Sequence, residues 1–280
     1  MALLIDFSQI VIGSYMTAAK YSTVDMDVIR PAVLNTLRIY RNKFVSEYGE
    51  LILCCDDRHT WRKDIFPNYK ASRKKTRKVS GIDWQNLYDC LNQLKDELRY
   101  WFPYKLIQVE KAEADDIIGA LVKKSYYTNQ NALILSGDKD FIQLHNNRVK
   151  QYNPVLNKFV GQGDTPSIYI KEHLLKGDRS DGIPNVLSDD NVFIEGRRQR
   201  PLTKKKIESW VNEMVMTFTE EEQKNYDRNR ELIDLSCIPP ELEAKIYNEF
   251  DEVKVAHRSK ILNYFITRKL KTLIEVIDEF

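Results

Sequence analysis

The sequence predicts an α/β fold whose central, mostly parallel sheet is flanked by helices. Four short apolar runs have the composition of buried strands: 2–7, 51–55, 104–109 and 132–135. Helical patterns lie between them, and strands that alternate with helices favour a parallel sheet covered on both faces. After about residue 184 the alternation fades, so the remainder is predicted to be a helical C-terminal region.

Periodicity and cap signals locate the helices. Apolar residues recur at helical spacing over 29–44, over 87–98 and over 114–121. In the C-terminal region Thr203 predicts a helix cap, and 219–222 matches a capping box. The helix after Thr203 would carry Ile207, Trp210, Val211 and Met214. Helices after the Pro239-Pro240 pair would bury Ile246, Phe250, Ile261, Phe265, Leu273 and Ile277. Segments 157–165 and 187–201 are expected to be loops.

Length and composition indicate a globular protein. With 280 residues, of which 42% are hydrophobic, the chain can form one large domain, or one domain with a smaller appendage. The four cysteines form no CxxC pair, which gives poor support to a disulfide framework or a zinc site and favours a reducing cytoplasm. Neither a signal peptide nor a run of transmembrane length is evident, so no membrane association is expected.

Charge is distributed unevenly along the chain. The net charge is only +2, yet residues 58–78 contain nine basic residues and one acid. This segment carries +8, which leaves −6 on the rest of the chain. A basic stretch beside concentrated acids is what an enzyme needs to act on a polyanion through bound metals.

Nine acidic residues stand at the ends of predicted strands and the starts of predicted helices. They are Asp6, Asp56, Glu113, Asp115, Asp116, Asp138, Asp140, Asp178 and Asp181. The carboxyl ends of parallel strands open onto one crevice, where these side chains would repel one another unless divalent cations lay among them. Oxygen ligands suit magnesium, and two such ions support phosphodiester cleavage. The four histidines form no metal-ligand pair in the sequence, which lowers the odds of zinc.

Each acidic motif also has an ordinary structural interpretation. The acids of 113–116 are typical of a helix N-terminus, 136–140 of a turn that caps a helix, and 177–184 of a surface loop. If Glu113, Asp115 and Asp116 all serve one site, Glu113 must lie in a cap or an irregular first turn. Independent caps have no reason to occur in this order and spacing, so the joint pattern favours a metal site.

The basic segment contains aromatic residues among its charges. Trp61, Phe66 and Tyr69 offer stacking surfaces for unpaired bases beside phosphate contacts. Most charged runs are merely solvated faces, but this mixture favours contact with nucleic acid. Because the segment lacks a strong hydrophobic period, it is expected to become ordered when substrate binds. Its proposed contacts are Arg58, Trp61, Lys63, Tyr69, Lys74, Lys75, Arg77 and Lys78.

These motifs resemble the 5′-nuclease superfamily of flap endonucleases and bacterial DNA polymerase 5′-nuclease domains. The matching segments cover roughly the first two-thirds of the chain: Asp6, then Asp56 with 61–62 and 69–73, then 113–116, 136–140 and 177–181. The chain length, the Leu-Ile-Asp-Phe-Ser-Gln opening and the C-terminal region look most like the ribonuclease H of tailed bacteriophages. Despite its name, that group does not share the fold of ordinary ribonuclease H.

The resemblance implies a PIN-like fold and a two-magnesium site in which manganese could substitute. Asp6, Asp56, Glu113, Asp115, Asp116 and Asp138 would form the first metal site, directly or through water. Asp140, Asp178 and Asp181 would form the second. Arg62, Lys70 and Arg73 would steer the scissile phosphate as catalytic residues within an arch over about 58–82. Residues 1–185 would be the catalytic core, and residues 186–280 a DNA-binding region.

The implied activity is that of a ribonuclease H, 5′→3′ exonuclease and flap endonuclease that removes RNA primers from lagging-strand fragments. Its substrates would be RNA–DNA hybrid, duplex and 5′-flap DNA. It would act as a monomer in the cytoplasm, that of the host cell if the chain is phage-encoded, with a single-strand-binding protein as a possible partner. Two alternatives stay open: a non-catalytic, structure-specific DNA-binding protein and a PIN-type single-strand ribonuclease.

One segment departs from the family pattern. Many relatives carry a glycine-rich helix-hairpin-helix after the position of 181–184, but 186–199 lacks its Gly-x-Gly turn. A basic cluster follows instead, which we expect to contact duplex phosphates. Its members are Arg197, Arg198, Arg200, Lys204, Lys205 and Lys206.

Overall fold

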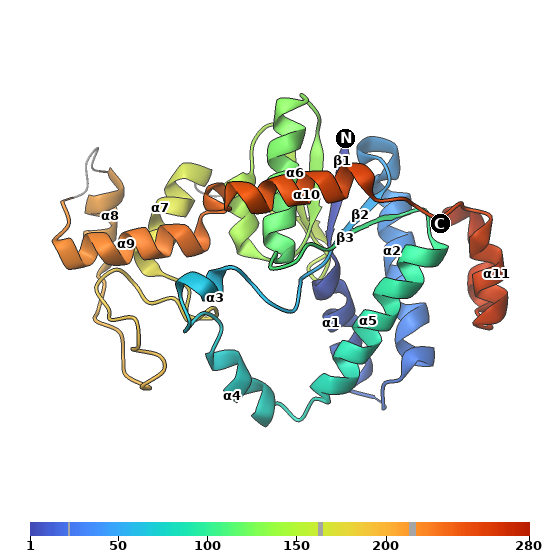
Figure 1. Cartoon of the computed structure of the whole chain (residues 1–280), viewed down its shortest axis with the longest axis horizontal. Helices are drawn as coiled ribbons and strands as arrows, with labels where there is room; N and C mark the ends of the chain where they lie inside the picture. Colours follow the sequence, from blue (N-terminus) through green and yellow to red (C-terminus); the bar gives the residue numbers. More distant parts are fainter. Residues whose placement is uncertain (22, 162–164, 213–216) are drawn as a thin grey trace.

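The computed structural model describes residues 1–21, 23–161, 165–212 and 217–280 (Figure 1). Within these residues a six-stranded sheet has the order β3-β2-β1-β4-β5-β6. The strands are β1 (Ala2–Asp6), β2 (Leu51–Cys54), β3 (Lys105–Ile107), β4 (Ala132–Leu135), β5 (Val149–Asn153) and β6 (Lys158–Phe159). All neighbours pair in parallel except β5 and β6, which are antiparallel. The predicted, mostly parallel sheet is confirmed.

The central strands are buried on both faces. Side chains of a strand point alternately to its two faces, so Leu3 and Ile5 of β1 enter one core cluster and Leu4 enters the other. Ile5 pairs with Leu53 of β2 and Leu135 of β4, and both join Ile5 in the first cluster. This double burial explains why these strands read as continuous apolar runs.

Helices cover each face of the sheet. On one face the first core cluster gathers α1 (Phe7–Ala18), α2 (Met26–Tyr48), α5 (Trp84–Trp101) and α11 (Lys260–Thr267). On the other face the second cluster gathers α6 (Ala114–Tyr127) and α10 (Pro240–Glu252). The C-terminal helices thus return to pack on the core. Short terminal elements complete the first face: α12 (Lys271–Ile274) and η3 (Ile277–Glu279).

The segment predicted as an arch contains two short helices, α3 (Arg62–Ile65) and α4 (Ser72–Val79). In Figure 1 they run along one edge of the molecule, between the α7–α9 group and the start of α5. The described side chains of α4 are exposed or half-buried. Arg77 anchors α4 to α5, because its guanidinium lies 5.0 Å from the ring centre of Trp84.

The helical C-terminal region is confirmed, because α8 (Lys204–Asn212), α9 (Glu220–Ile233), α10 and α11 all follow residue 186. In Figure 1, α8 and α9 form a group at one end together with α7 (Pro166–Lys176), which precedes that region. The Thr203 hydroxyl accepts a hydrogen bond from Lys206 N at 3.3 Å, and the capping box at the start of α9 is complete. Met214 lies outside the described residues. The chain over 187–201 is a loop, as predicted.

A short strand and two 3-10 helices lie between the longer elements. The expected loop over 157–165 contains the short strand β6, whose two residues are too few to show a strand pattern in the sequence. The 3-10 helices η1 (Lys139–Leu144) and η2 (Leu235–Cys237) follow β4 and α9, respectively. Across the described part of the chain, none of the helices combines the length and apolar content needed to cross a bilayer.

Candidate active site

Acidic residues gather where the strand order of the sheet reverses. The chain moves from β1 outward to β2 and β3, then returns to place β4 on the other side of β1. A crevice forms at such a switch point, outside the carboxyl ends of the strands. Asp6 is the last residue of β1, Asp56 follows β2, and Asp138 follows β4.

Asp6 is the most enclosed acid of this group. Its carboxylate accepts hydrogen bonds from Gln9 N and from Ser136 Oγ, each at 3.1 Å, and the residue is 8% exposed. Burial, together with the charges of Asp56 and Asp138, raises the pKa of Asp6 to about 7. These three carboxylates therefore lie close enough to repel one another.

The start of α6 adds a second set of acids. The helix begins at Ala114, so Glu113 precedes its first turn, as a shared site requires. Asp56 Oδ1 accepts a hydrogen bond from Ala114 N at 2.9 Å and so ties the end of β2 to this helix start. Burial raises the pKa of Asp115, as do the charges of Asp138 and Asp6, although Lys70 opposes the shift. Asp115 thus faces the same crevice.

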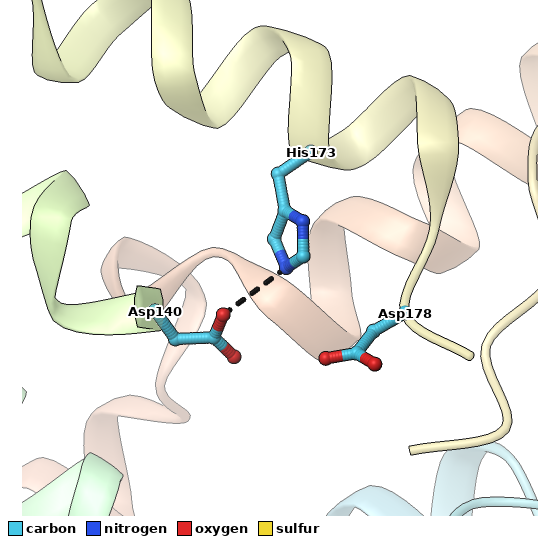
Figure 2. Close-up of side chains that lie close together, drawn as sticks. All are labelled: Asp140, His173 and Asp178. Carbon is cyan, nitrogen blue, oxygen red and sulfur yellow. Dashed lines mark ion pairs between the residues drawn. The ribbon is translucent and has the colours of Figure 1, made fainter. Parts of the chain in front are cut away.

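Asp140, His173 and Asp178 form a second cluster (Figure 2). One ligand atom from each of these side chains lies within 4.8 Å of the other two, and His173 Nε2 is 3.1 Å from Asp140 Oδ1. Asp140 is the second residue of η1, His173 lies in the last turn of α7, and Asp178 follows that helix. His173 was not among the site residues predicted from the sequence. Its position five residues before Asp178, on the helix that precedes the 177–181 motif, was the available signal.

The two clusters adjoin a pocket of about 690 Å³. Asp138 and Asp140, at the start of η1, line it together with Asp178, which follows α7. Lys139 and Arg179, both exposed, also line it, although the sequence analysis assigned them no role. Two cations beside carboxylates at the mouth of a pocket suit a ligand that is itself an anion.

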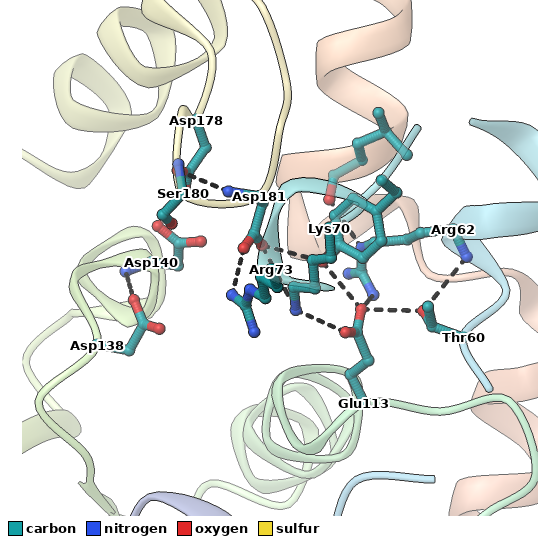
Figure 3. Close-up of polar contacts among 12 residues, drawn as sticks. Thr60, Arg62, Lys70, Arg73, Glu113, Asp138, Asp140, Asp178, Ser180 and Asp181 are labelled. Atoms are coloured by element: carbon teal, nitrogen blue, oxygen red, sulfur yellow. Dashed lines mark hydrogen bonds and ion pairs between the residues drawn. The ribbon is translucent and has the colours of Figure 1, made fainter. Parts of the chain in front are cut away.

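Asp181 lies between the acids and the base of the arch (Figure 3). Its carboxylate accepts a hydrogen bond from the Tyr69 hydroxyl at 3.1 Å and forms ion pairs with Lys70, at 3.5 Å, and with Arg73. Lys70 Nζ also lies 2.6 Å from Glu113 Oε1. Although burial opposes the shift, the charges of Lys70 and Arg62 lower the pKa of Glu113 to about 2. Two of the three predicted catalytic cations therefore border the acids.

Arg62 occupies a different place from the one predicted. It is 3% exposed, and its guanidinium pairs with Glu113 at 2.9 Å and with Asp116 at 2.8 Å. Its Nε donates to the carbonyl of Leu232 at 2.8 Å. These buried partners leave no face for a phosphate, so the expectation that Arg62 steers the substrate does not match its position.

Asp116 belongs to the same buried network. Its carboxylate is fully buried and accepts hydrogen bonds from Trp61 Nε1, Arg62 Nη1 and Glu113 N at 2.9–3.1 Å. The predicted metal ligand Asp116 is thus occupied by protein donors. Asp115 and Asp116 both lie in the first turn of α6, so the sequence alone could not show which of the two would be occupied by protein donors.

The predicted stacking aromatics are also buried. Trp61 is 7% and Tyr69 3% exposed, with their polar atoms bonded to Asp116 and to Glu113 and Asp181. Neither ring offers a face for a base, contrary to expectation. Of the predicted arch cations, Arg58, Lys63, Lys74 and Lys78 are exposed and Arg77 is half-buried, while the side chain of Lys75 lies outside the described ones.

The C-terminal basic cluster is partly neutralised by acids. Arg197 pairs with Asp189 at 3.1 Å and with Glu195 at 2.5 Å. Lys204 lies 3.5 Å from Glu208, and Lys206 lies 3.1 Å from Glu222. Arg200 lies 3.7 Å from Asp189, and Arg198 and Lys205 are exposed. The cluster therefore presents fewer free charges than the sequence suggested.

Comparisons with known proteins agree with this architecture. Residues 1–173 match the family model of the 5′-3′ exonuclease N-terminal resolvase-like domain, and residues 164–280 match the T4 RNase H C-terminal domain. The chain is 32% identical to ribonuclease H of Enterobacteria phage T4, over 99% of this chain and 95% of that protein. It is 26% identical to a flap endonuclease Xni of Shewanella, over 66% of this chain and 69% of that protein.

Solved structures with the same fold include the D15 protein of bacteriophage T5, co-crystallised with metal ions. That protein superposes with a TM-score of 0.64 at 15% identity, over 90% of this chain and 98% of the other. A T5 D15 flap endonuclease variant in complex with DNA and metal ions gives a TM-score of 0.66 at 15% identity, with the same coverage. The PIN-like fold is thus confirmed. The chain belongs to the 5′-3′ exonuclease family of nucleases, with a C-terminal domain of the T4 RNase H type.

Proposed function

We propose that this nuclease uses two magnesium ions to hydrolyse phosphodiesters of RNA–DNA hybrid, duplex and 5′-flap substrates. In the cell it would remove RNA primers during lagging-strand replication. The observation that carries the proposal is the crowding of Asp6, Asp56, Asp115 and Asp138 at the sheet's switch point, beside the cations Lys70 and Arg73.

The donor set fits hard dications. Burial and mutual repulsion raise the pKa values of Asp6, Asp115 and Asp138, so a cation among them would relieve both penalties. Asp6, Asp56, Asp115 and Asp138 would hold one ion. Asp140, Asp178 and Asp181 would take part in holding the other. Bound magnesium would favour the deprotonated form of the attacking water and neutralise charge on the phosphate.

Protein cations would position the substrate. Arg73 keeps 42% of its side chain exposed, and Lys70 keeps 17%, so both can approach a phosphate oxygen above the acids. Manganese, which takes the same oxygen ligands, would substitute for magnesium. The buried Arg62 would act as a positioning residue, because it holds Glu113 beside Lys70.

The nucleic acid would contact the protein on two sides of this site. We propose that the arch over 58–82 contacts the 5′ single strand through Arg58, Lys63, Lys74 and Lys78, and that residues 186–280 hold the duplex. Exposed basic side chains support both contacts through phosphate binding. The protein would act as a monomer in the cytoplasm of a host cell, and a single-strand-binding protein would be a suitable partner.

A cleavage assay tests the proposal. The pure protein is incubated with a 5′-labelled, RNA-primed nick substrate and with a 5′-flap substrate, with magnesium or with a chelator. Magnesium-dependent products from both are expected. Asp138→Asn should abolish cleavage and leave folding intact, because Asp138 is exposed and Asn retains the cap that it forms over Asp140 N.

The matched control is Asp96→Asn, an exposed acid on α5 that pairs only locally, with Arg99. It should cleave like the wild type. Binding without cleavage in any metal would instead support a structure-specific binding protein. Cleavage of free single-stranded RNA with no preference for a junction would support a PIN-type ribonuclease.

A further inference from the structure

His173 projects from α7 into the gap between two acids of the second cluster (Figure 2). Its Nε2 atom faces Asp140 at 3.1 Å, and Asp178 completes a triad whose ligand atoms all lie within 4.8 Å of one another. When the ring is protonated, His173 and Asp140 form an ion pair at this distance. A metal ion could take the place of that proton, because one imidazole nitrogen and two carboxylates that converge are a set of metal ligands.

The imidazole is held in place by its own helix. The ring of Tyr169, one turn earlier on α7, stacks on it with centroids 5.7 Å apart and planes 22° from parallel. The His173 side chain is 17% exposed. Stacking holds the ring by its face and leaves the nitrogen atoms at its edge accessible. Nε2 is therefore oriented toward Asp140 and Asp178 without a bound ion.

Asp178 is fixed relative to His173 by the end of the helix. Gly177 ends α7 with φ +66°, and a Cβ atom there would lie 2.4 Å from the carbonyl oxygens of Ile183 and Pro184. This close backbone contact sets the turn that aims Asp178 back toward His173. On the opposite side, Asp138 accepts a hydrogen bond from Asp140 N at 3.0 Å and so fixes the start of η1.

The two metal positions then differ in donor chemistry. The acids around Asp6 offer only oxygen, the preferred ligand of magnesium. An imidazole beside two carboxylates gives a mixed oxygen and nitrogen set, which favours manganese, cobalt or zinc over magnesium.

We propose that His173 Nε2 is a direct ligand of the second metal, with Asp140 and Asp178, and that it makes this position prefer first-row transition-metal ions, manganese among them, to magnesium. The inference rests on the proposed two-metal function. It gives manganese an advantage over magnesium at one position, beyond the role of a substitute.

Electron spin-echo envelope modulation of the Mn²⁺-loaded full chain tests the assignment. The wild type should show coupling of manganese to an imidazole ¹⁴N nucleus as Mn²⁺ is added from half to two equivalents. His173→Gln should lose this coupling and bind one of two Mn²⁺ ions 10- to 100-fold more weakly by calorimetry, with Mg²⁺ affinity nearly unchanged. His173→Asp should lose the coupling and shift the preference of that position toward Mg²⁺.

The control is His257→Gln, because His257 is exposed and its hydrogen-bond partner among the described residues is Ser259, two residues away. It should keep the wild-type spectrum. Thermal unfolding in chelator establishes that each variant folds. Manganese that binds without ¹⁴N coupling in the wild type, or coupling that persists in His173→Gln, would overturn the assignment.

Flap cleavage by the same wild-type sample separates this inference from the proposed function. Cleavage without ¹⁴N coupling would refute the ligand and leave the nuclease function standing. Coupling without cleavage in any metal would refute the function and leave the ligand standing.

Discussion

Arg62 Nη2 lies 2.8 Å from Asp116 Oδ1, and both side chains are almost wholly buried, at 3% and 0% exposed. The pair joins the base of the arch to the start of α6. Glu113 accepts from the same guanidinium, so one cation balances two carboxylates beneath the acidic crevice. Breaking a buried ion pair by removing one partner is costly, since the other charge stays without compensation.

Removal of Arg62 should therefore destabilise the fold. Arg62→Met keeps the volume but leaves Asp116 and Glu113 without their shared cation, and we expect a loss of about 3–5 kcal/mol in the free energy of unfolding. Urea titration with tryptophan fluorescence measures it. The control Lys63→Met changes an exposed neighbour and should alter stability little. Equal stability of the two variants would contradict a structural role for Arg62.

Asp6 should make the metal-free protein less stable as the pH rises. Its folded pKa of about 7 lies above the ordinary value of 3.8, so the unfolded chain ionises first and stability falls between about pH 4 and pH 7. Asp6→Asn removes this charge and keeps an acceptor for Gln9 N. Its stabilising effect in chelator should be larger at pH 8 than at pH 5, by on the order of 3 kcal/mol.

Thermal or urea unfolding at both pH values checks this dependence. Asp96→Asn should show no such difference. With saturating magnesium the order should reverse, because the wild type alone keeps the full set of ligands. If the stability of Asp6→Asn had the same pH dependence as that of the wild type, burial and the neighbouring acids would not raise the pKa of Asp6.

Arg73 should contribute to the chemical step. It pairs with Asp181 and keeps 42% of its side chain exposed at the edge of the acids, where a donor can stabilise charge on the phosphate. Arg73→Ala should lower the single-turnover rate at saturating enzyme about 100-fold. Lys78→Ala, on the same helix but exposed, should weaken binding and leave that saturated rate unchanged. The reverse split would contradict both roles.

Glu97 should stabilise the packing of the C-terminal helices on the core. It accepts hydrogen bonds from Arg30 Nε at 2.8 Å and from the Tyr264 hydroxyl at 2.6 Å, and it lies 3.0 Å from Arg268. Burial opposes ionisation, yet these partners lower the pKa of Glu97. Its contribution is therefore present above about pH 4.5, the ordinary value, and is lost as the pH falls through the lower folded value.

Glu97→Gln removes the buried counterion of Arg30 and leaves it only the exposed Asp27, 3.2 Å away. We expect a loss of about 3–5 kcal/mol at pH 7, smaller below pH 4, measured by urea unfolding. Asp96→Asn alters the neighbouring exposed acid and provides the control. A constant difference across this pH range would show that the charge of Glu97 is not the stabilising feature.

Lys205 tests the C-terminal contact with duplex. Within the described part of α8, Lys204 and Lys206 have acidic partners, whereas Lys205 is exposed with no ion pair found. Lys205→Ala should weaken duplex binding and reduce the slope of log affinity against log salt by about one phosphate contact. Lys245→Ala, exposed on α10, should change neither. An unchanged slope for Lys205→Ala would show that Lys205 on α8 does not contact a phosphate of the duplex.

The sheet and the order of its acids could be predicted because they depend on local pattern. Leu3, Ile5 and Leu53 belong to continuous apolar runs, which mark buried strands in the sequence, and Asp6 is the polar residue that ends the first of these runs. The helix start at Ala114 followed from the acids of its first turn.

Which acid faces which partner could not be predicted, because it depends on contacts across long sequence separations. Arg62 meets the carbonyl of Leu232, 170 residues away, and this contact fixes the guanidinium below the crevice. Trp61 and Tyr69 are buried by the same packing. His173 joins Asp140 only through the docking of α7 on η1.

The carboxylate of Asp181 could be neutralised either by protein cations or by a metal ion. In this structure it is balanced by Lys70 and Arg73, the same cations that a polynucleotide would recruit. If a divalent metal ion bound Asp181, it would replace these ion pairs, and Lys70 and Arg73 would then be available to bind phosphates of the incoming strand. Loading of ions and loading of substrate should accordingly reinforce each other, each improving the other's affinity by an equal factor.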